Sequence, residues 1–231
     1  ANSRILLMQI HRLSPYLRLM RVDKPVGTYL VLLPALSALW LASGGIPPLW
    51  ELIVFIVGAF VMRSAGCVIN DYADRHWDGA VARTCDRPLA CGEIPPKHAL
   101  NLFIGLVLIG GLLVLTLRAE VLLWSLGAVL LATLYPFTKR WLYYPQLFLG
   151  LAFAWAIPMA IVAVIGTMPQ AGWWLFAAIV LWALIYDTWY ALVDKEDDLK
   201  VGIKSTAILF GNHLLVIMIA LMLIMLWTLH Q

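Results

Sequence analysis

The chain has 231 residues, of which 63% are hydrophobic and only 13% are charged, and its mean hydropathy is +0.89. Ordinary soluble domains are nearer half apolar and a quarter charged, so this composition argues against a soluble protein. The net charge of +3 is small, and we expect no nucleic-acid partner.

The apolar residues fall in blocks of about 20, the length that crosses a bilayer as a helix. Strand-like alternation is absent, and only helices or closed barrels satisfy every backbone group in lipid. We therefore predict an all-α fold, a multi-span transmembrane helical bundle surrounded by membrane lipid. The alternative is an unusually apolar soluble bundle. The seven predicted spans cover residues 25–43, 49–69, 99–117, 119–137, 145–166, 171–193 and 213–230.

Basic residues gather on one side of the predicted membrane. If the seven spans alternate in direction, the Lys and Arg residues between spans lie on that side, and the opposite side carries Arg118 alone. Lys and Arg are enriched in cytoplasmic loops, so the two long loops at 70–98 and 194–212 are predicted to face the cytoplasm. Most acidic residues lie on the same side, where we expect the function to reside.

An aspartate motif lies at the start of each long loop. The first, NDYADRHWD, covers 70–78, and the second, YDTWYALVDKEDD, runs from the sixth span into the loop at 186–198. The two motifs share a pair of aspartates four residues apart, which suggests an internal repeat of about 25–137 and 145–231. If the spans continue as helices, each motif forms a polar stripe on one helix face. The first stripe holds Asn70, Asp74 and Asp78 with Asp71 beside it, and the second holds Asp187, Asp194 and Asp198.

Stacked carboxylates repel one another, so the stripes predict a bound cation. Carboxylates without His or Cys favour hard cations, and Mg²⁺ takes one or two carboxylates together with phosphate oxygens. Two opposed stripes would clamp a diphosphate through Mg²⁺, and its lipid tail would lie among the spans. Nearby basic side chains could bind the phosphate oxygens directly, namely Arg75, Arg83, Arg87, Lys139, Arg140 and Lys204.

A cation-coupled transporter is a competing interpretation, because repeats and intramembrane carboxylates also occur in transporters. The acidic residues of a transporter should lie at mid-span, whereas nearly all of those in this chain lie at span ends. Asp187 is the exception, since it lies within a predicted span, where ionisable groups are costly and usually functional. The pattern therefore favours an enzyme over a transporter.

Four ordered segments resemble the UbiA superfamily of intramembrane prenyltransferases. They are RVDKPVGTYLVLLP at 21–34, NDYADRHWDGAVARTCDRPL at 70–89, YPFTKR at 135–140 and YDTWYALVDKEDDLKVGIKSTAILFG at 186–211. The resemblance runs from about residue 12 to residue 211. It implies a single domain of nine helices, so with seven spans the chain is expected to lack the last two.

Within that superfamily, the segments are most similar to the branch that acts in ubiquinone biosynthesis. The resemblance implies Mg²⁺-dependent transfer of a polyprenyl group from polyprenyl diphosphate to 4-hydroxybenzoate, at the ring carbon ortho to the hydroxyl. It also implies a bacterial inner-membrane location with the site facing the cytoplasm. Other acceptors, such as homogentisate, a naphthoate, haem or a glycerol lipid, remain alternatives.

The resemblance assigns roles to specific residues. The metal ligands would be Asn70, Asp71, Asp74, Asp78, Asp187, Asp194 and Asp198, with Asp74, Asp78, Asp194, Asp198 and Arg140 catalytic. The diphosphate would be bound by Asn70, Arg83, Arg87, Lys139 and Lys204. The candidates for the acceptor pocket are Arg21, Lys24, Arg63 and Tyr135, the three basic residues being alternatives for the acceptor's carboxylate.

Overall fold

The computed structural model describes residues 14–81 and 83–231. The described residues form helices joined by turns and loops, without strands, and seven of their segments are long and apolar enough to cross a membrane. The prediction of seven helical spans is thus confirmed. The spans are α2 (Val26–Ser43), α3 (Leu49–Asp74), α4 (Pro96–Val114), α5 (Ala119–Thr138), α6 with α7 (Pro145–Ala154 and Ala156–Ile165), α8 (Gln170–Val193), and α10 with α11 (Thr206–Phe210 and Leu214–His230).

The first motif only partly continues its span as a helix. α3 runs five residues beyond the predicted span end and carries Asn70 and Asp74, but it stops at Asp74. Asp78 lies in a separate 3₁₀ turn, η1 (Asp78–Ala80). The prediction of a three-residue helical stripe is therefore wrong for Asp78, because the chain turns after Asp74, with Trp77 N–H donating to the Asp74 carbonyl at 2.8 Å.

The second motif is broken in a different place. α8 ends at Val193, and Asp194 is a bend residue that begins the short helix α9 (Lys195–Val201). Asp187 and Asp198 therefore lie on two helices instead of one, and the second predicted stripe is also wrong as a continuous helical face. Glu196, Asp197 and Asp198 occupy the first turn of α9, where the helix dipole favours negative charge.

The fifth span is divided at Trp155 into α6 and α7. Pro158 has no N–H to offer the carbonyl four residues earlier, so the regular helical ladder is interrupted there. α6 packs closely on α8, and a Cβ added at Gly150 would lie 2.7 Å from the Val180 carbonyl oxygen. Small residues allow such close backbone approach between membrane helices.

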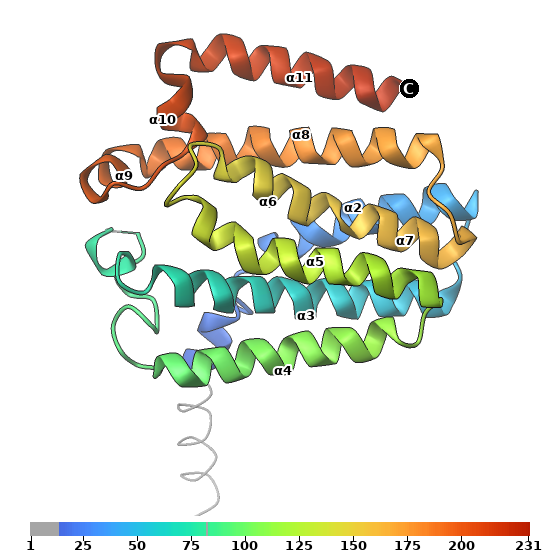
Figure 1. The fold of residues 1–231 in the computed structure, drawn as a ribbon, viewed down its shortest axis with the longest axis horizontal. Helices are drawn as coiled ribbons and strands as arrows, with labels where there is room; N and C mark the ends of the chain where they lie inside the picture. Colours follow the sequence, from blue (N-terminus) through green and yellow to red (C-terminus); the bar gives the residue numbers. More distant parts are fainter. Residues whose placement is uncertain (1–13, 82) are drawn as a thin grey trace, which may run out of the picture.

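The spans form a bundle in which the axes of the helices lie roughly along one line of direction (Figure 1). α2 packs against α7, α3 against α4, and α11 lies alongside α8 at the edge of the bundle. Many large apolar side chains on α4, α5 and α11 are exposed, as expected for surfaces in contact with lipid. The loop after α3 and the helix α9 emerge at the same end of the bundle, which brings the two aspartate motifs together (Figure 1).

Candidate active site

The carboxyl end of α3 is stabilised by arginines. A carboxylate such as Asp74 is unfavourable at this end, where the helix dipole is negative. Arg75 Nη1 donates to the Tyr72 carbonyl at 2.5 Å, and Arg140 Nη2 donates to the Ala73 carbonyl. These donors satisfy carbonyls that the helix leaves unpaired, and their positive charge offsets the dipole.

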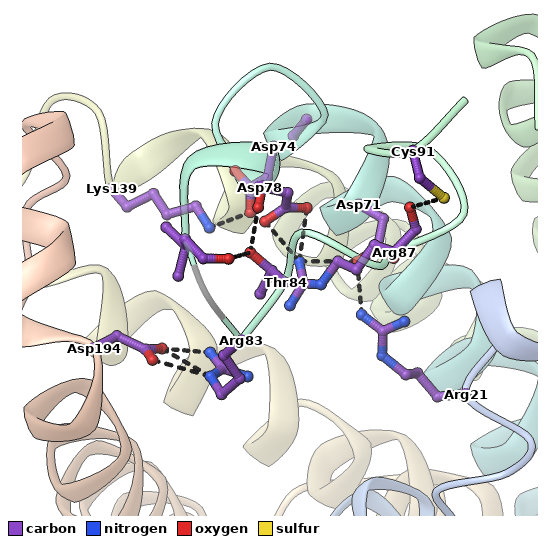
Figure 2. Close-up of polar contacts among 12 residues, drawn as sticks. Arg21, Asp71, Asp74, Asp78, Arg83, Thr84, Arg87, Cys91, Lys139 and Asp194 are labelled. Carbon is purple, nitrogen blue, oxygen red and sulfur yellow. Dashed lines mark hydrogen bonds and ion pairs between the residues drawn. The ribbon is translucent and has the colours of Figure 1, made fainter. Parts of the chain in front are cut away.

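Each carboxylate of the first motif is paired with a basic side chain (Figure 2). Lys139 forms an ion pair with Asp74. Arg87 Nη1 lies 2.9 Å from Asp78 Oδ2 and 3.1 Å from Asp71 Oδ1, so one guanidinium joins the helix to the turn that follows it. The basic residues thus hold Asp78 near Asp74 although it lies outside α3.

Asp71 is the most deeply buried carboxylate of the site, with a relative exposure of 0%. Arg21 Nη2 donates to its Oδ1 atom at 2.9 Å from the segment that precedes α2. The other oxygen, Oδ2, has no hydrogen-bond partner in the part of the chain that the structure describes. Asp71 therefore connects the amino-terminal segment to α3 through its Oδ1 atom, while its Oδ2 atom accepts no hydrogen bond from the described residues.

The two motifs meet directly. Arg83 donates to Asp194 through two nitrogens, Nε to Oδ1 at 3.0 Å and Nη2 to Oδ2, a two-pronged contact between the loops (Figure 2). α9 ends at Val201. The next residue, Gly202, has a left-handed φ of 75°, and Ile203 N–H donates back to the Asp198 carbonyl at 2.9 Å. This turn, which favours glycine, reverses the chain and returns Lys204 to the site.

A polar pocket of about 270 Å³ lies between the motifs. Its wall carries carboxylates from both motifs and basic residues from three loops. They are Asp74, Asp78, Asp187, Asp194 and Asp198 together with Arg83, Arg87, Lys139 and Lys204, and Asn70, Gln146 and Ser205 add neutral polar groups. Such a mixed wall suits a ligand with both anionic oxygens and a bound cation.

Burial perturbs the pocket carboxyls that lie outside the spans. Loss of water raises the pKa of Asp198 to about 6, and repulsion from Asp194 acts in the same direction, while Lys139 and Arg83 oppose it. Burial also raises the pKa of Asp78, although Arg87 partly offsets the effect. Both carboxyls would gain from a further positive charge in the pocket.

A second, largely apolar cavity of about 500 Å³ extends from this pocket into the bundle. Its far wall includes Val54 and Phe55 of α3 and Leu117, at the other end of the bundle from the motifs. The two spaces share a ring of wall residues, which are Asn70, Arg83, Arg87, Tyr135, Asp187 and Tyr190. A polar head bound between the motifs would therefore continue directly into an apolar channel.

The sequence matches the model of the UbiA prenyltransferase family over residues 31–230. The chain belongs to the UbiA prenyltransferase family. It is 59% identical over 206 residues to a 4-hydroxybenzoate octaprenyltransferase from Hydrogenovibrio crunogenus, a match that covers 88% of this chain and 72% of that protein.

Solved structures share the UbiA fold. A UbiA homologue from Aeropyrum pernix is 26% identical, with a TM-score of 0.73 over 88% of this chain and 75% of its own. Another, from Archaeoglobus fulgidus and bound to GPP and Mg²⁺, is 22% identical, with a TM-score of 0.75 over 93% of this chain and 76% of its own. The helical bundle is thus that of the family, and the chain is an integral membrane protein.

In this UbiA-family chain, all four candidates for an acceptor pocket line the apolar cavity, namely Arg21, Lys24, Arg63 and Tyr135. They differ in their partners. Arg21 is bound to Asp71, whereas the side chain of Arg63 forms no hydrogen bond or ion pair within the described ranges. Arg63 therefore presents a guanidinium on the cavity wall without a competing carboxylate.

Arg140, predicted to be catalytic, lies outside both pockets. Its guanidinium caps α3 and stacks over Trp77, with the Cζ atom 4.3 Å from the ring centroid. Arg87, predicted to bind diphosphate, lines the polar pocket but also bridges Asp71 and Asp78. The contacts of Arg140 with α3 and Trp77, and those of Arg87 with the two aspartates, suggest that these arginines position the first motif.

Among the described residues, no three or more His, Cys, Asp or Glu side chains are close enough together to hold a metal ion. The pocket wall nevertheless supplies oxygen ligands from both motifs, the type that Mg²⁺ prefers. Mg²⁺ commonly uses few carboxylates and completes its shell with water and phosphate oxygens. The residues therefore fit a metal that arrives with a diphosphate better than a preformed metal cage.

Sequence reasoning missed Gln146, Tyr190 and Ser205, which also line the polar pocket. Tyr190 lies three residues after Asp187 on α8, so helical spacing could have identified it. Ser205 directly follows Lys204 in the segment at 186–211 that resembles the UbiA superfamily, so its position next to a predicted site residue was a usable signal. Gln146 follows a proline at the start of α6, and no local pattern distinguishes it.

Proposed function

We propose that this chain transfers a polyprenyl group from polyprenyl diphosphate to 4-hydroxybenzoate, as in ubiquinone biosynthesis. The name of the 59%-identical relative supports this reaction. The observation that carries the proposal is the continuity of the two spaces, a polar pocket for a diphosphate and an apolar cavity for a tail. The bond to be broken would lie at the shared ring of residues.

The basic residues would bind the diphosphate. Lys139 and Arg83 each face a carboxylate, Asp74 and Asp194 respectively. A Mg²⁺ ion bound by these carboxylates would supply positive charge that stabilises the leaving diphosphate. The two basic side chains would then turn to phosphate oxygens, so that charge-assisted hydrogen bonds form where negative charge develops.

The reaction balances without a further co-reactant. The C–O bond to the diphosphate breaks, and the diphosphate leaves with the bonding electron pair. The allylic carbon forms a C–C bond with the ring carbon ortho to the hydroxyl, and that ring carbon gives its proton to the released diphosphate. The apolar cavity wall would keep water from the allylic carbon.

Arg63 is the residue that we assign to the carboxylate of the acceptor. It lies on α3 and lines the cavity close to the shared ring, about two helical turns before Asn70. A guanidinium binds a carboxylate in two-pronged geometry, and Arg63 has no such partner within the chain as described. Tyr135, on the shared ring, would orient the substrates.

We propose that the site faces the cytoplasm of a bacterial inner membrane. The basic residues of the loops around the pocket, such as Arg83, Arg87 and Lys204, support this orientation. Expression in a bacterium should therefore give a protein whose pocket opens to the cytoplasm.

The proposal is tested by incubating the purified 231-residue chain with polyprenyl diphosphate, Mg²⁺ and 4-hydroxybenzoate. We expect a prenylated product that disappears when Mg²⁺ is chelated. Asp74→Ala and Asp194→Ala should each reduce turnover at least a hundredfold, because removing one charged stabilising group typically costs roughly that much. Glu120→Ala is the matched control, since Glu120 is an exposed carboxylate on α5, away from the pocket.

Two results would overturn parts of the proposal. If 4-hydroxybenzoate gives no product but homogentisate or a naphthoate does, the acceptor assignment is wrong. If Asp74→Ala retains full turnover, the carboxylates of the first motif do not act as proposed.

A further inference from the structure

Ser205 has a buried hydroxyl without a partner. The residue is only 2% exposed, and its Oγ atom has no hydrogen-bond partner among the residues described. Ser205 nevertheless lines the polar pocket. A buried hydroxyl is normally paired, because leaving it unpaired costs free energy. An unpaired hydroxyl on a pocket wall therefore suggests a hydrogen-bond partner that comes with the ligand.

The backbone around Ser205 is fixed on both sides. Lys204 N–H donates to the Lys139 carbonyl at 3.0 Å, and Thr206 N–H donates to Gln146 Oε1 at 3.1 Å. The Thr206 hydroxyl also lies 2.7 Å from that of Thr188 on α8. Three elements thus anchor the residues that flank Ser205, while its own hydroxyl makes none of these bonds.

Gln146 offers a second neutral donor on the same wall. It is 5% exposed and lines the polar pocket. Because Thr206 N–H is bonded to its Oε1 atom, the amide orientation is set and the Nε2 group is the end left to donate. Ser205 and Gln146 are therefore two neutral donors on one wall. The N–H of Thr206, the residue after Ser205, holds the Gln146 amide in place.

These donors differ from the basic residues of the pocket. Lys139 is paired with Asp74, and Arg83 with Asp194, so each must exchange a carboxylate for a phosphate oxygen. The Ser205 hydroxyl has no carboxylate to release. Rotation about its side-chain torsion can change the direction of the hydroxyl without breaking a hydrogen bond that the described residues make.

We propose that Ser205 Oγ, together with Gln146 Nε2, donates a hydrogen bond to a non-bridging oxygen of the substrate diphosphate. This inference rests on the proposed function, since it identifies a further binding residue of the same site. A hydroxyl can donate to an oxyanion of any phosphate, but the pocket's opposed carboxylates and bases fit a metal-bound diphosphate.

The test measures binding of inorganic diphosphate with Mg²⁺ to the full 231-residue chain in detergent by calorimetry. Ser205→Ala should weaken binding roughly ten- to a hundredfold, the usual effect of removing a hydrogen bond to a charged group. Ser205→Thr keeps a hydroxyl and should bind within a few-fold of the original chain. Thermal unfolding of Ser205→Ala should be unchanged or slightly higher, because no intramolecular bond is lost.

Ser43→Ala is the matched control. The Ser43 hydroxyl is also buried without a partner in the described structure, but it lies at the end of α2, away from both pockets. Unchanged diphosphate binding by Ser205→Ala, or equal weakening in Ser43→Ala, would overturn the inference. A fall in unfolding temperature with Thr as well as Ala at position 205 would also overturn it, because the role would then be structural.

The two proposals fail in different ways. If the original chain binds diphosphate and prenylates 4-hydroxybenzoate while Ser205→Ala behaves identically, only the role of Ser205 is wrong. If the original chain forms no prenylated product from any acceptor, the proposed function is wrong, whatever the Ser205 variants bind.

Discussion

Arg21 has a costly backbone conformation at the edge of the site. Its φ angle is 58°, in the left-handed region that residues other than glycine seldom adopt. The conformation closes a helix end, since Arg21 N–H donates to the Arg18 carbonyl and Val22 N–H to the Leu17 carbonyl, both at 3.0 Å. Glycine is the usual residue at this position. The side chain explains the exception, because its guanidinium binds the buried carboxylate of Asp71.

A pair of substitutions separates the two contributions of Arg21. Arg21→Ala and Arg21→Gly both remove the contact with Asp71, but only glycine relieves the left-handed strain. We expect the glycine variant to be more stable than the alanine variant by about 1 kcal/mol, or roughly 2–4 °C in unfolding temperature. Thermal unfolding followed by circular dichroism in detergent measures the difference.

Lys24 provides the control for this comparison, because its φ angle is not positive. Lys24→Gly should therefore have no stability advantage over Lys24→Ala. Equal unfolding temperatures for the two Arg21 variants would show that the left-handed conformation imposes no strain.

The sequence predicted most of the charged residues of the site but not their partners. Aspartates four apart at span ends indicated a cation site, and the structure brings both motifs to one pocket. The pairing of Arg87 with two aspartates could not be read from a pattern, because it depends on how the loop after α3 folds back. Ser205 was missed because a missing hydrogen bond is visible only in three dimensions.

At the scale of elements, α2 and α3 approach each other where Gly27 faces Arg63. A Cβ added at Gly27 would overlap the Arg63 guanidinium, with Cζ only 2.6 Å away. The absence of a side chain at position 27 therefore lets the guanidinium lie against the backbone of α2. Because the guanidinium is the flexible end of a side chain, an added methyl group would displace it with little effect on packing elsewhere.

We therefore expect Gly27→Ala to weaken use of the acceptor selectively. If Arg63 binds the acceptor's carboxylate, its displacement should raise KM for 4-hydroxybenzoate roughly tenfold, the effect of weakening one charge-assisted hydrogen bond. KM for polyprenyl diphosphate should change less than twofold. Steady-state kinetics with each substrate varied in turn makes the measurement.

Gly105→Ala on α4 is the control, since an added Cβ there meets nothing within 4 Å apart from the adjacent residues and the backbone of its own helix. Both KM values should stay unchanged in that variant. An unchanged KM for 4-hydroxybenzoate in Gly27→Ala, or an equal rise for both substrates, would contradict the assignment of Arg63.

Element boundaries show where prediction from the sequence stops. The apolar run predicted that the second span ends at residue 69, but α3 continues to Asp74. Its last carbonyls are bonded by Arg75, which is adjacent, and by Arg140, which is far away in the sequence. Local propensity cannot register a cap supplied by a distant residue. The break after Val193 is equally non-local, because Asp194 is bound to Arg83 of the other loop.

At the scale of the whole molecule, composition was enough to identify the membrane spans. Apolar length is a strong local signal, whereas the arrangement of helices depends on side-chain contacts between distant segments. The internal repeat stays a prediction. The two motifs share aspartate spacing, but the helix breaks at different places, after Asp74 in the first motif and before Asp194 in the second.

The orientation of the bundle can be tested through its cysteines. Cys85 and Cys91 are exposed in the loop after α3, whereas Cys67 is only 5% exposed within that helix. The basic residues of this loop predict that it faces the cytoplasm. A membrane-impermeant maleimide should therefore label the chain in inverted bacterial vesicles and leave it unlabelled in intact spheroplasts.

The reciprocal variant makes this test independent of thiol reactivity. Replacing Cys85 and Cys91 by serine and adding Glu120→Cys moves the exposed thiol to the start of α5, at the opposite end of the bundle. Labelling should then occur in spheroplasts and be lost in inverted vesicles. Labelling of the original chain in intact spheroplasts would place the polar pocket outside the cytoplasm. The high Lys and Arg content of these loops would then need another explanation, because loops rich in Lys and Arg normally stay on the cytoplasmic side of the membrane.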